Sequence, residues 1–308
     1  TLTLFRLMND KNIKFDQDQL IGIFNLVDEF CKSAQSYVSA HWIGSQSTSS
    51  FPAPTRVPNL EASEIMTILI YYNYSGYKNF QYYYQRMVAT DLRPYFPKLC
   101  SYHRFLELIE RVSLPMYVLA KLLCCQSKKT GVYFIDSKKI VVSDNRRIHS
   151  HKVFKDLAKR GKGSMGWFFG FKLHLVINQF GEVINFEITA ANKADNNQNL
   201  LRNLLQNLKG TCFGDKGYLT KLWQELYKNG LKLITKTKKN MKNQLITLWE
   251  KYTLRKRAVI ESVNDILTSV FDLEHSRHRK PINAFTHMVA TLVAYHFYPE
   301  KPRVFVYN

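Results

Sequence analysis

The hydrophobic pattern of this 308-residue chain changes at Gly131 from helical spacing to the spacing of β-strands. Before that residue, apolar side chains recur every three or four positions, as at Leu20, Ile23, Phe24 and Val27, which predicts an amphipathic helix. After it, short β-branched and aromatic runs are separated by turn residues, which predicts strands. We therefore expect an all-helical N-terminal region followed by an α/β domain.

In the first 125 residues we expect helices over 15–40, 64–74, 76–88 and 101–123, the last broken near Pro115. Ser63 is expected to be the N-cap of the second helix, because its hydroxyl can accept a hydrogen bond from a free backbone amide. Residues 44–58 hold Ser, Thr and three prolines, a composition typical of a linker. The tyrosine-rich stretch 71–84 is expected to pack against neighbouring helices.

In the second part we expect strands at 132–135, 140–142, 167–177, 182–189, 211–213 and 231–235, and helices at 197–208, 219–228 and 256–271. The first strands are antiparallel, and strands and helices then alternate, which predicts a mixed sheet flanked by helices. The apolar run 284–298 is too short to span a membrane and is expected to be a buried helix. The predicted domains are 1–125 and 126–308.

The net charge of +20 is concentrated in the second domain. Residues 1–125 hold 12 Lys and Arg against 10 Asp and Glu, whereas residues 126–308 hold 32 against 14. This excess favours a polyanionic partner such as a nucleic acid. The five cysteines include no Cys-x-x-Cys pair, so neither a disulfide framework nor a thiolate zinc site is expected, and a reducing cytoplasm fits best. The first residues lack a signal-peptide pattern.

Three acids stand where a catalytic site is expected. Asp136 ends the first strand, Asp215 follows the strand at 211–213, and Glu261 lies on the polar side of the last predicted helix. Sites in open α/β sheets form at the carboxyl ends of strands. Carboxylates there can hold Mg²⁺ ions, and two such ions can clamp the oxygens of a phosphoryl transfer. The alternative is that Asp136 only caps a turn and that Glu261 pairs with Arg257 four residues earlier.

The sequence around these acids resembles bacterial insertion-sequence transposases of the DDE type, and most closely insertion-sequence family nine-eight-two. The resemblance covers about residues 130–300 strongly and the helical front more loosely, through Glu61–Thr67. Its motifs are Phe134-Ile135-Asp136-Ser137, Gly166-Trp167-Phe168-Phe169-Gly170-Phe171-Lys172-Leu173-His174, Gly214-Asp215-Lys216-Gly217-Tyr218, Arg257-x3-Glu261 and His275-Ser276-Arg277-His278-Arg279. The Phe-Phe-Gly-Phe-Lys-Leu-His run is the most specific of them.

The resemblance implies an RNase H-like mixed five-stranded sheet. It implies that Asp136, Asp215 and Glu261 are catalytic and bind two Mg²⁺ ions, for which Mn²⁺ can substitute, with Asp136 bridging both. The enzyme would be a DNA transposase that cuts phosphodiester bonds at insertion-sequence ends and transfers the strands into target DNA. Its partners would be double-stranded DNA, as terminal inverted repeats and target, and a second copy in a homodimer, with no membrane and no small-molecule cofactor. The expected location is the bacterial cytoplasm, at the nucleoid.

Two positions depart from the pattern of a larger sister family, Tyr-x2-Arg-x3-Glu-x6-Lys. Leu254 stands at the place of its Tyr and Thr268 at the place of its Lys, so the DNA-contacting roles of those residues are not transferred. The gap between Asp215 and Glu261 is too short for an inserted domain. Two other functions stay open: an RNase H-like nuclease without strand transfer, and an inactive DNA-binding relic that represses its element.

Basic residues near the proposed catalytic segments are predicted to contact DNA phosphates. The predicted DNA-binding residues are Lys138, Lys139, Arg146, Arg147, Lys152, Lys172, His174, Lys216, Lys236, Lys238, Lys239, Arg257, Arg277, Arg279 and Lys280.

Several residues have two interpretations. His174 is either structural, which we favour, or a DNA or metal-site contact. A zinc site of His149, His151 and His174 is a weak alternative. Asp195 is expected to cap the helix at 197–208 rather than to serve as an extra acid near the site. Asp265 is a rival to Glu261. Trp167 is either a core residue or a platform on which an unpaired base stacks.

Overall fold

The computed structural model describes residues 15–41, 59–163, 166–236, 246–274 and 278–305. It divides into two compact units. The helical unit comprises residues 1–119 and 285–297, and the sheet unit comprises residues 120–284 and 298–308. Most of the last helix thus groups with the N-terminal helices, and the domain boundary between residues 125 and 126 stays a prediction.

The N-terminal part of the helical unit contains only helices among its described residues, as expected from the apolar spacing. The elements are α2 (Gln17–His41), α3 (Ala62–Tyr72), α4 (Phe80–Tyr82), the π-helix η1 (Tyr83–Asp91), α5 (Tyr102–Leu108), the 3-10 helix η2 (Ile109–Val112), α6 (Ser113–Gln126) and α11 (Pro281–Phe297). The predicted linker 44–58 lies outside the described residues. No helix within the described ranges is both long and apolar enough to cross a membrane.

Four rings of the tyrosine-rich stretch pack inside the helical unit, as predicted, whereas Tyr82 is 60% exposed. Tyr71, Tyr72, Tyr83 and Tyr84 are buried, and the Tyr83 hydroxyl donates a hydrogen bond of 3.0 Å to the Ile68 carbonyl. A hydroxyl that keeps a hydrogen bond loses little on burial. These rings therefore form core rather than surface.

The predicted N-cap of α3 is wrong by two residues. Ser63 is buried inside the helix, and Glu61 is the N-cap, in a capping box with Glu64. The Glu61 amide donates to Glu64 Oε2 at 2.7 Å, so the acidic pair satisfies free amides in place of the serine. Pro115 lies in the first turn of α6, where a missing N–H costs nothing. The break in this region is the 3-10 helix η2 before it.

The sheet unit is built on six strands. They are β1 (Val132–Ser143), β2 (Lys159–Gly163), β3 (Gly166–Asn178), β4 (Val183–Ala190), β5 (Gly210–Gly214) and β6 (Leu231–Thr235). Five of them follow the order β4-β3-β1-β5-β6, in which β3 is antiparallel to both β4 and β1, and β1, β5 and β6 are parallel. This is the RNase H-like arrangement implied by the resemblance.

The sixth strand was not predicted. β2 pairs antiparallel with the start of β3, and its sequence, Lys-Arg-Gly-Lys-Gly, has no apolar alternation. Its place is set by pairing with β3 and not by its own propensity. In the same region β1 is one continuous strand through Asp136, where two separate strands were expected, because the polar residues 136–139 keep their pairing with β3.

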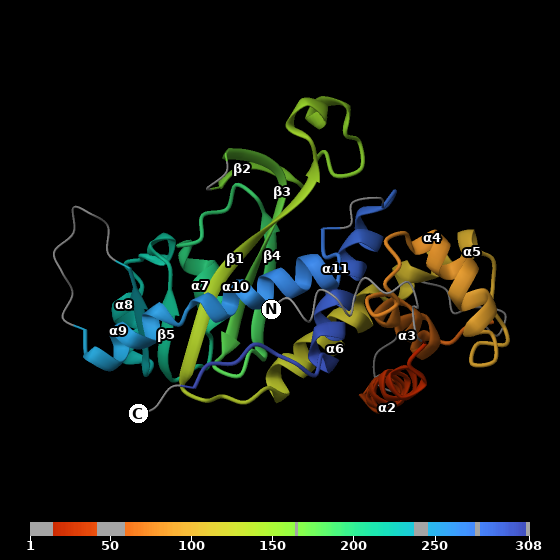
Figure 1. The fold of residues 1–308 in the computed structure, drawn as a ribbon, viewed down its shortest axis with the longest axis horizontal. Helices are drawn as coiled ribbons and strands as arrows, with labels where there is room; N and C mark the ends of the chain where they lie inside the picture. Colours follow the sequence, from red (N-terminus) through yellow and green to blue (C-terminus); the bar gives the residue numbers. More distant parts are fainter. Residues whose placement is uncertain (1–14, 42–58, 164–165, 237–245, 275–277, 306–308) are drawn as a thin grey trace. The chain divides into compact units, whose positions relative to one another are not determined.

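Helices cover both faces of the sheet (Figure 1). α7 (Gln198–Leu205) and α8 (Trp223–Lys228) pack in one cluster with Tyr133 and Ile135 of β1. On the other face, α10 (Ala258–Asp265) contacts β1, and α9 (Leu248–Arg255) contacts β5 and β6. Because side chains alternate along a strand, Phe134 and Asp136 share the face of α10, and Ser137 shares the face of α7.

Candidate active site at the end of the sheet

Asp136 lies on β1 under helix α10. Its side chain is 22% exposed, and its Oδ1 lies 3.6 Å from Arg257 Nη1. Its Oδ2 accepts a hydrogen bond of 3.2 Å from Asn264 Nδ2. Burial raises the pKa of Asp136 to about 6, opposed by the charge of Arg257 and by a backbone hydrogen bond, and reinforced by the charges of Glu261 and Asp215. The carboxylate is thus held in an environment that makes its negative charge costly.

Arg257 and Glu261 are placed by the start of α10. Arg257 is the N-cap of this helix and Glu261 lies in its first turn. Arg257 Nη2 donates to Glu261 Oε1 at 2.6 Å. The guanidinium therefore lies between Asp136 and Glu261 and pairs with both, so the predicted pairing of Glu261 with Arg257 is present together with the convergence of the two acids.

Asp215 follows β5, the parallel neighbour of β1, and is the N-cap of the 3-10 helix η4 (Lys216–Tyr218). Its side-chain charge is close enough to raise the pKa of Asp136. Asp265, the rival of Glu261, instead points to Lys138, with 3.7 Å between Oδ1 and Nζ, and its side chain is 74% exposed. Asp136 and Glu261 therefore share Arg257, Asp215 follows the neighbouring parallel strand, and Asp265 is directed elsewhere.

The three acids do not form a complete metal site in the described residues. Within the described ranges, no group of three or more His, Cys, Asp or Glu side chains is arranged to hold a metal ion. The Arg257 guanidinium stands between two of the three acids. The assignment of Asp136, Asp215 and Glu261 as metal ligands therefore stays a prediction.

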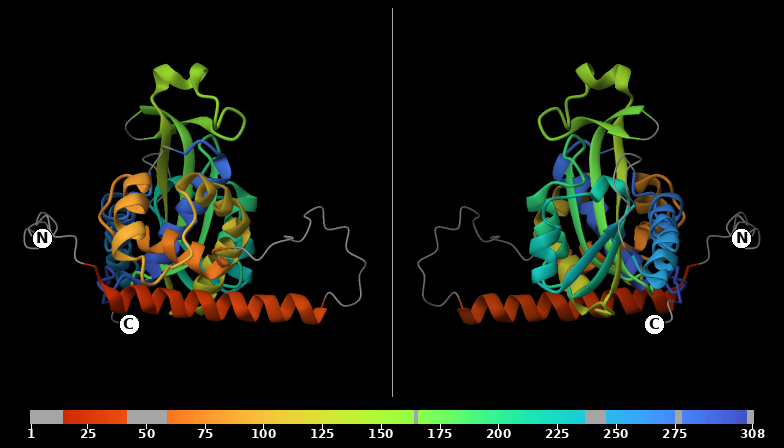
Figure 2. Two further views of the ribbon diagram at one scale, coloured as in Figure 1. Left: turned by 90° about the vertical axis from the view of Figure 1, so that its right-hand side faces the viewer. Right: turned by 90° about the vertical axis from the view of Figure 1, so that its left-hand side faces the viewer.

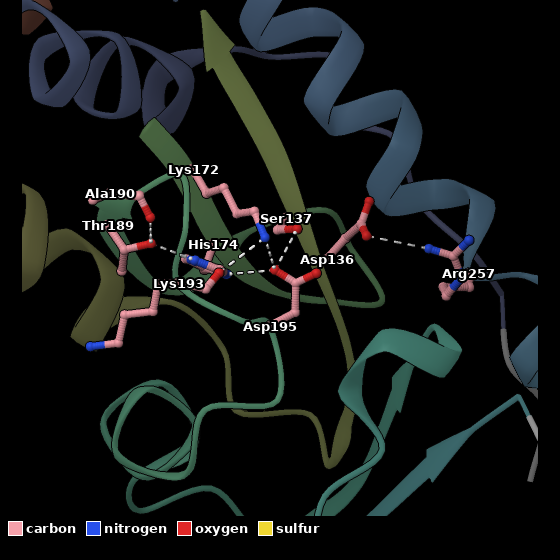
Figure 3. A network of polar contacts seen from close by, with 9 residues as sticks. All are labelled: Asp136, Ser137, Lys172, His174, Thr189, Ala190, Lys193, Asp195 and Arg257. Atoms are coloured by element: carbon pink, nitrogen blue, oxygen red, sulfur yellow. Dashed lines mark hydrogen bonds and ion pairs between the residues drawn. The ribbon is translucent and has the colours of Figure 1, made fainter. Parts of the chain in front are cut away.

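A second polar cluster lies on the opposite face of β1 (Figure 3). Asp195 Oδ1 accepts hydrogen bonds from Lys172 Nζ at 3.0 Å and from Ser137 Oγ at 3.2 Å. Lys172 Nζ also donates to the Lys193 carbonyl at 3.0 Å. Asp195 is thus tied to β1 and β3, next to the strand position of Asp136.

The expected capping role of Asp195 is wrong. Asn197 is the N-cap of α7, and its side chain accepts the hydrogen bond from the Leu200 amide. Asp195 is the extra acid near the site that the alternative interpretation described. Its partners come from strands distant in sequence, so local pattern could not reveal them.

His174 is structural. Its ring is fully buried, with Nε2 3.0 Å from Thr189 Oγ1 and Nδ1 3.9 Å from Asp195 Oδ1. Burial lowers its pKa to about 4. A ring with no exposed surface cannot contact a phosphate, so His174 is removed from the DNA-binding residues. The alternative zinc site is not formed either, because no three His, Cys, Asp or Glu side chains in the described residues are arranged to hold a metal ion. His151 stacks on Phe154, with 5.6 Å between ring centroids.

The excursion between β1 and β2, together with β2 itself, forms what we call the basic arm, residues 144–163. It projects beyond the strands in both views of Figure 2. Phe154 anchors it, being buried with its ring centroid 5.6 Å from that of Phe171. Its exposed cations are Arg146, Arg147, Lys152, Lys155, Lys159, Arg160 and Lys162. Two exposed acids, Asp144 and Asp156, accompany them, so the arm is strongly positive.

Trp167 stands beside the arm and is 56% exposed, so its core interpretation is wrong. The Arg160 guanidinium lies over its ring, 5.9 Å from the centroid. Its neighbour in the motif, Gly170, has a packing reason to be glycine, because a Cβ there would collide with the Ile140 carbonyl of the paired strand.

The other predicted DNA-binding residues are distributed around the site. Lys216, Lys236, Arg279 and Lys280 are exposed. Lys138 and Lys139 are half-buried, and Lys172 is occupied by Asp195. Lys238, Lys239 and Arg277 lie outside the described residues.

A cavity of about 770 Å³ lies beyond Asp215, between η4, α8 and β6. Its lining includes Tyr218, Lys221 and two largely exposed aromatic rings, Trp223 and Tyr227.

Comparisons with known proteins give a family for the part of the chain that holds these residues. Residues 126–281 match the model of a family described as "Transposase DDE domain". No curated protein matches the chain. Among solved structures, the chain is similar to one titled "Crystal structure of the Mos1 Strand Transfer Complex", at 12% identity over 94% of this chain and 100% of that one, with a TM-score of 0.23. So low a score supports no detailed comparison, and the fold is identified from strand order and pairing.

Proposed function

The chain belongs to the family of transposases with a DDE domain, and from this premise we propose that it cuts DNA at the ends of a mobile element and joins the cut strands to target DNA. The observation that carries the proposal is the meeting of Asp136, Arg257 and Glu261 where helix α10 lies on β1, inside the matched domain. The insertion-sequence family nine-eight-two stays a prediction.

The donor chemistry of the site fits divalent cations. Asp136, Asp215 and Glu261 offer carboxylate oxygens, the ligands that Mg²⁺ and Mn²⁺ prefer. The buried Oδ1 of Asn264 has no hydrogen-bond donor, and its amide already contacts Asp136. Bound there, two ions would supply Lewis-acid stabilisation to the attacking and leaving oxygens of the phosphodiester.

The residues of the chain prepare this chemistry. Asn264 orients the Asp136 carboxylate through its hydrogen bond. The exposed Lys216, adjacent to Asp215, and the basic arm would hold phosphates of double-stranded DNA near the acids. A substrate with so many negative charges would otherwise be repelled by them. Two element ends must be joined, and so we propose that the working form is a homodimer.

A second candidate function is an inactive DNA-binding relic. It is favoured by one observation, namely that no three potential ligands in the described residues are arranged around an ion position. A nuclease without strand transfer would share all the features of the site, and only its products would differ.

The test uses linear DNA carrying the sequences that flank the gene, with MgCl₂ or MnCl₂. We expect cleavage by the wild-type protein, and its loss in Asp136→Asn, Asp215→Asn and Glu261→Gln. Asp265→Asn is the matched control, because Asp265 is an exposed acid of the same helix that pairs with Lys138.

Each outcome decides between the candidates. Cleavage that survives Asp136→Asn contradicts the proposed site. No metal-dependent cleavage by a folded wild-type protein that still binds the DNA indicates the relic. Cut ends that never appear joined to a supercoiled target plasmid indicate the nuclease.

A further inference from the structure

The guanidinium of Arg257 lies where the negative charges of the site converge. It pairs with Asp136 Oδ1 at 3.6 Å and with Glu261 Oε1 at 2.6 Å. These two acids belong to different elements, β1 and α10. Within the described residues, Arg257 is thus a positive charge shared between two of the acids assigned to the metal ions.

This cation is buried but incompletely bonded. Its side chain is 12% exposed, and its Nε and Nη1 atoms have no hydrogen-bond acceptor. Buried donors without partners are costly, and the contact to Asp136 is longer than a hydrogen bond. The arrangement offsets one of the two negative charges without making full use of the guanidinium, whose Nε and Nη1 donors stay unbonded.

We infer that Arg257 is a resident counterion that competes with divalent cations for Asp136 and Glu261, and that it turns to a DNA phosphate when the ions bind. The inference rests on the proposed function. A cation of charge two brought against the same carboxylates repels the guanidinium and removes its partners. The planar fork of an arginine matches the oxygens of a phosphate, and a guanidinium turned outward would bring its unbonded Nε and Nη1 donors to one.

Metal ions and DNA then favour each other's binding. Without DNA, an ion must displace Arg257 from Glu261 and leave the guanidinium without an anion. With DNA, the displaced guanidinium gains a phosphate, so the ion binds more tightly. Because such coupling is reciprocal, the ion strengthens DNA binding by the same factor. Until both are present, Arg257 offsets one of the negative charges of the site.

The experiment is calorimetric titration of the full chain with MnCl₂, without DNA. We expect Arg257→Gln to bind Mn²⁺ at least about tenfold more tightly than the wild type, because a competing charge within a few ångströms is gone. Arg255→Gln is the matched control, since it removes the same charge from an exposed position two residues away. Arg257→Lys keeps the charge without the fork and should lie between wild type and Arg257→Gln.

The opposite sign overturns the inference. If Arg257 only orients the carboxylates for the ion, Arg257→Gln binds Mn²⁺ more weakly than the wild type or equally well. Should Arg257→Gln not fold, the wild type still decides. Its Mn²⁺ affinity must rise when a 20-base-pair duplex is added in buffer without Ca²⁺. This rise must be smaller in the folded Arg257→Lys variant. Equal shrinkage in Arg255→Gln contradicts the inference.

Failure of the inference is distinguishable from failure of the proposed function. Mn²⁺ binding that is lost in Asp136→Asn but unaffected by Arg257→Gln rejects the counterion and leaves the active site in place. Absence of any binding that depends on Asp136 rejects both.

Discussion

Asp136 and Asp195 lie close along the same part of the sheet but on opposite faces, and their surroundings differ. Asp195 accepts two hydrogen bonds of ordinary length, from Lys172 and Ser137. Asp136 accepts one from Asn264 and one from the Ser137 backbone, and its cation, Arg257, lies at 3.6 Å with unused donors. The two carboxylates are therefore bonded to a similar extent, and the difference lies in their cations: Lys172 is hydrogen-bonded, whereas Arg257 keeps unbonded donors. We propose that these unbonded donors mark the functional side of the sheet.

The largest expected difference between the two acids is in DNA cleavage, measured after each acid is neutralised. Asp136→Asn should reduce the rate about a thousandfold or more, because a lost ion ligand removes several kcal/mol of transition-state stabilisation. Asp195→Asn should keep the rate within about tenfold, since Asn can still accept from Ser137. Single-turnover cleavage at saturating protein measures both. Equal losses would show that the two faces act together.

On the Asp195 side of the sheet, His174 is expected to make the stability of the protein depend on pH. Burial lowers the pKa of His174 to about 4, while Asp195 opposes the shift and Lys172 and Lys193 reinforce it. Below pH 6.5 the unfolded chain binds a proton that the folded ring refuses. The free energy of unfolding should therefore fall as the pH falls from 6.5 to 4, by roughly 3 kcal/mol from this group. Urea unfolding of the wild type and of His174→Gln checks it, because the variant should have the shallower slope.

Removing one partner of the Lys172–Asp195 ion pair should lower the free energy of unfolding. Asp195→Ala leaves Lys172, with a side chain 12% exposed, without its carboxylate. We expect a loss of about 2 kcal/mol, below the value for a fully buried pair because Asp195 is 27% exposed. The double variant Lys172→Met/Asp195→Leu should recover most of it. A double variant as unstable as Asp195→Ala would mean that the packing of Asp195, rather than its charge, is what matters.

The smallest expected effect is on DNA binding, where an exposed cation should contribute and a cation bonded to an acid should not. Arg147 is exposed on the basic arm, whereas Lys172 is bonded to Asp195. Arg147→Gln should lower the slope of log affinity against log salt by about one, and Lys172→Gln should leave the slope unchanged. Fluorescence anisotropy with a labelled duplex at several salt concentrations measures it. A lower slope in Lys172→Gln would return this lysine to the DNA-binding residues.

The sequence predicted the elements whose own pattern specifies them. Four strands of the main sheet and the buried helix α11 carry strong apolar runs, so their spacing was enough. The strand β1 was expected as two strands, because its residues 136–139 are polar. The strand β2 and the role of Asp195 were missed for a common reason. β2 depends on pairing with β3, and Asp195 depends on partners 23 and 58 residues away. Neither leaves a local signal.

The three candidate acids were predicted by position and resemblance, but the contact of Arg257 with Asp136 was not. Asp215 follows a strand as predicted, whereas Asp136 lies inside β1 and not at its end as predicted. Helical spacing indicated Glu261. The place of Arg257 between two of them is a tertiary fact, because the four-residue spacing to Glu261 predicts only the ion pair on one helix. The contact with Asp136 requires that α10 lie on β1, as it does.

The helix that carries Glu261 continues without interruption into the π-helix η5 (Ile266–Val270), closed by a hydrogen bond from the Phe271 amide to the Ile266 carbonyl. A π-turn holds one residue more than an α-turn, so it rotates everything after it about the helix axis. The two ends of this helix are consequently aimed independently, one at the carboxylates and the other at the core around Leu267 and Phe271. Deleting a single residue there would restore uniform winding and force one end out of alignment, an error of angular phase that no side-chain replacement could correct.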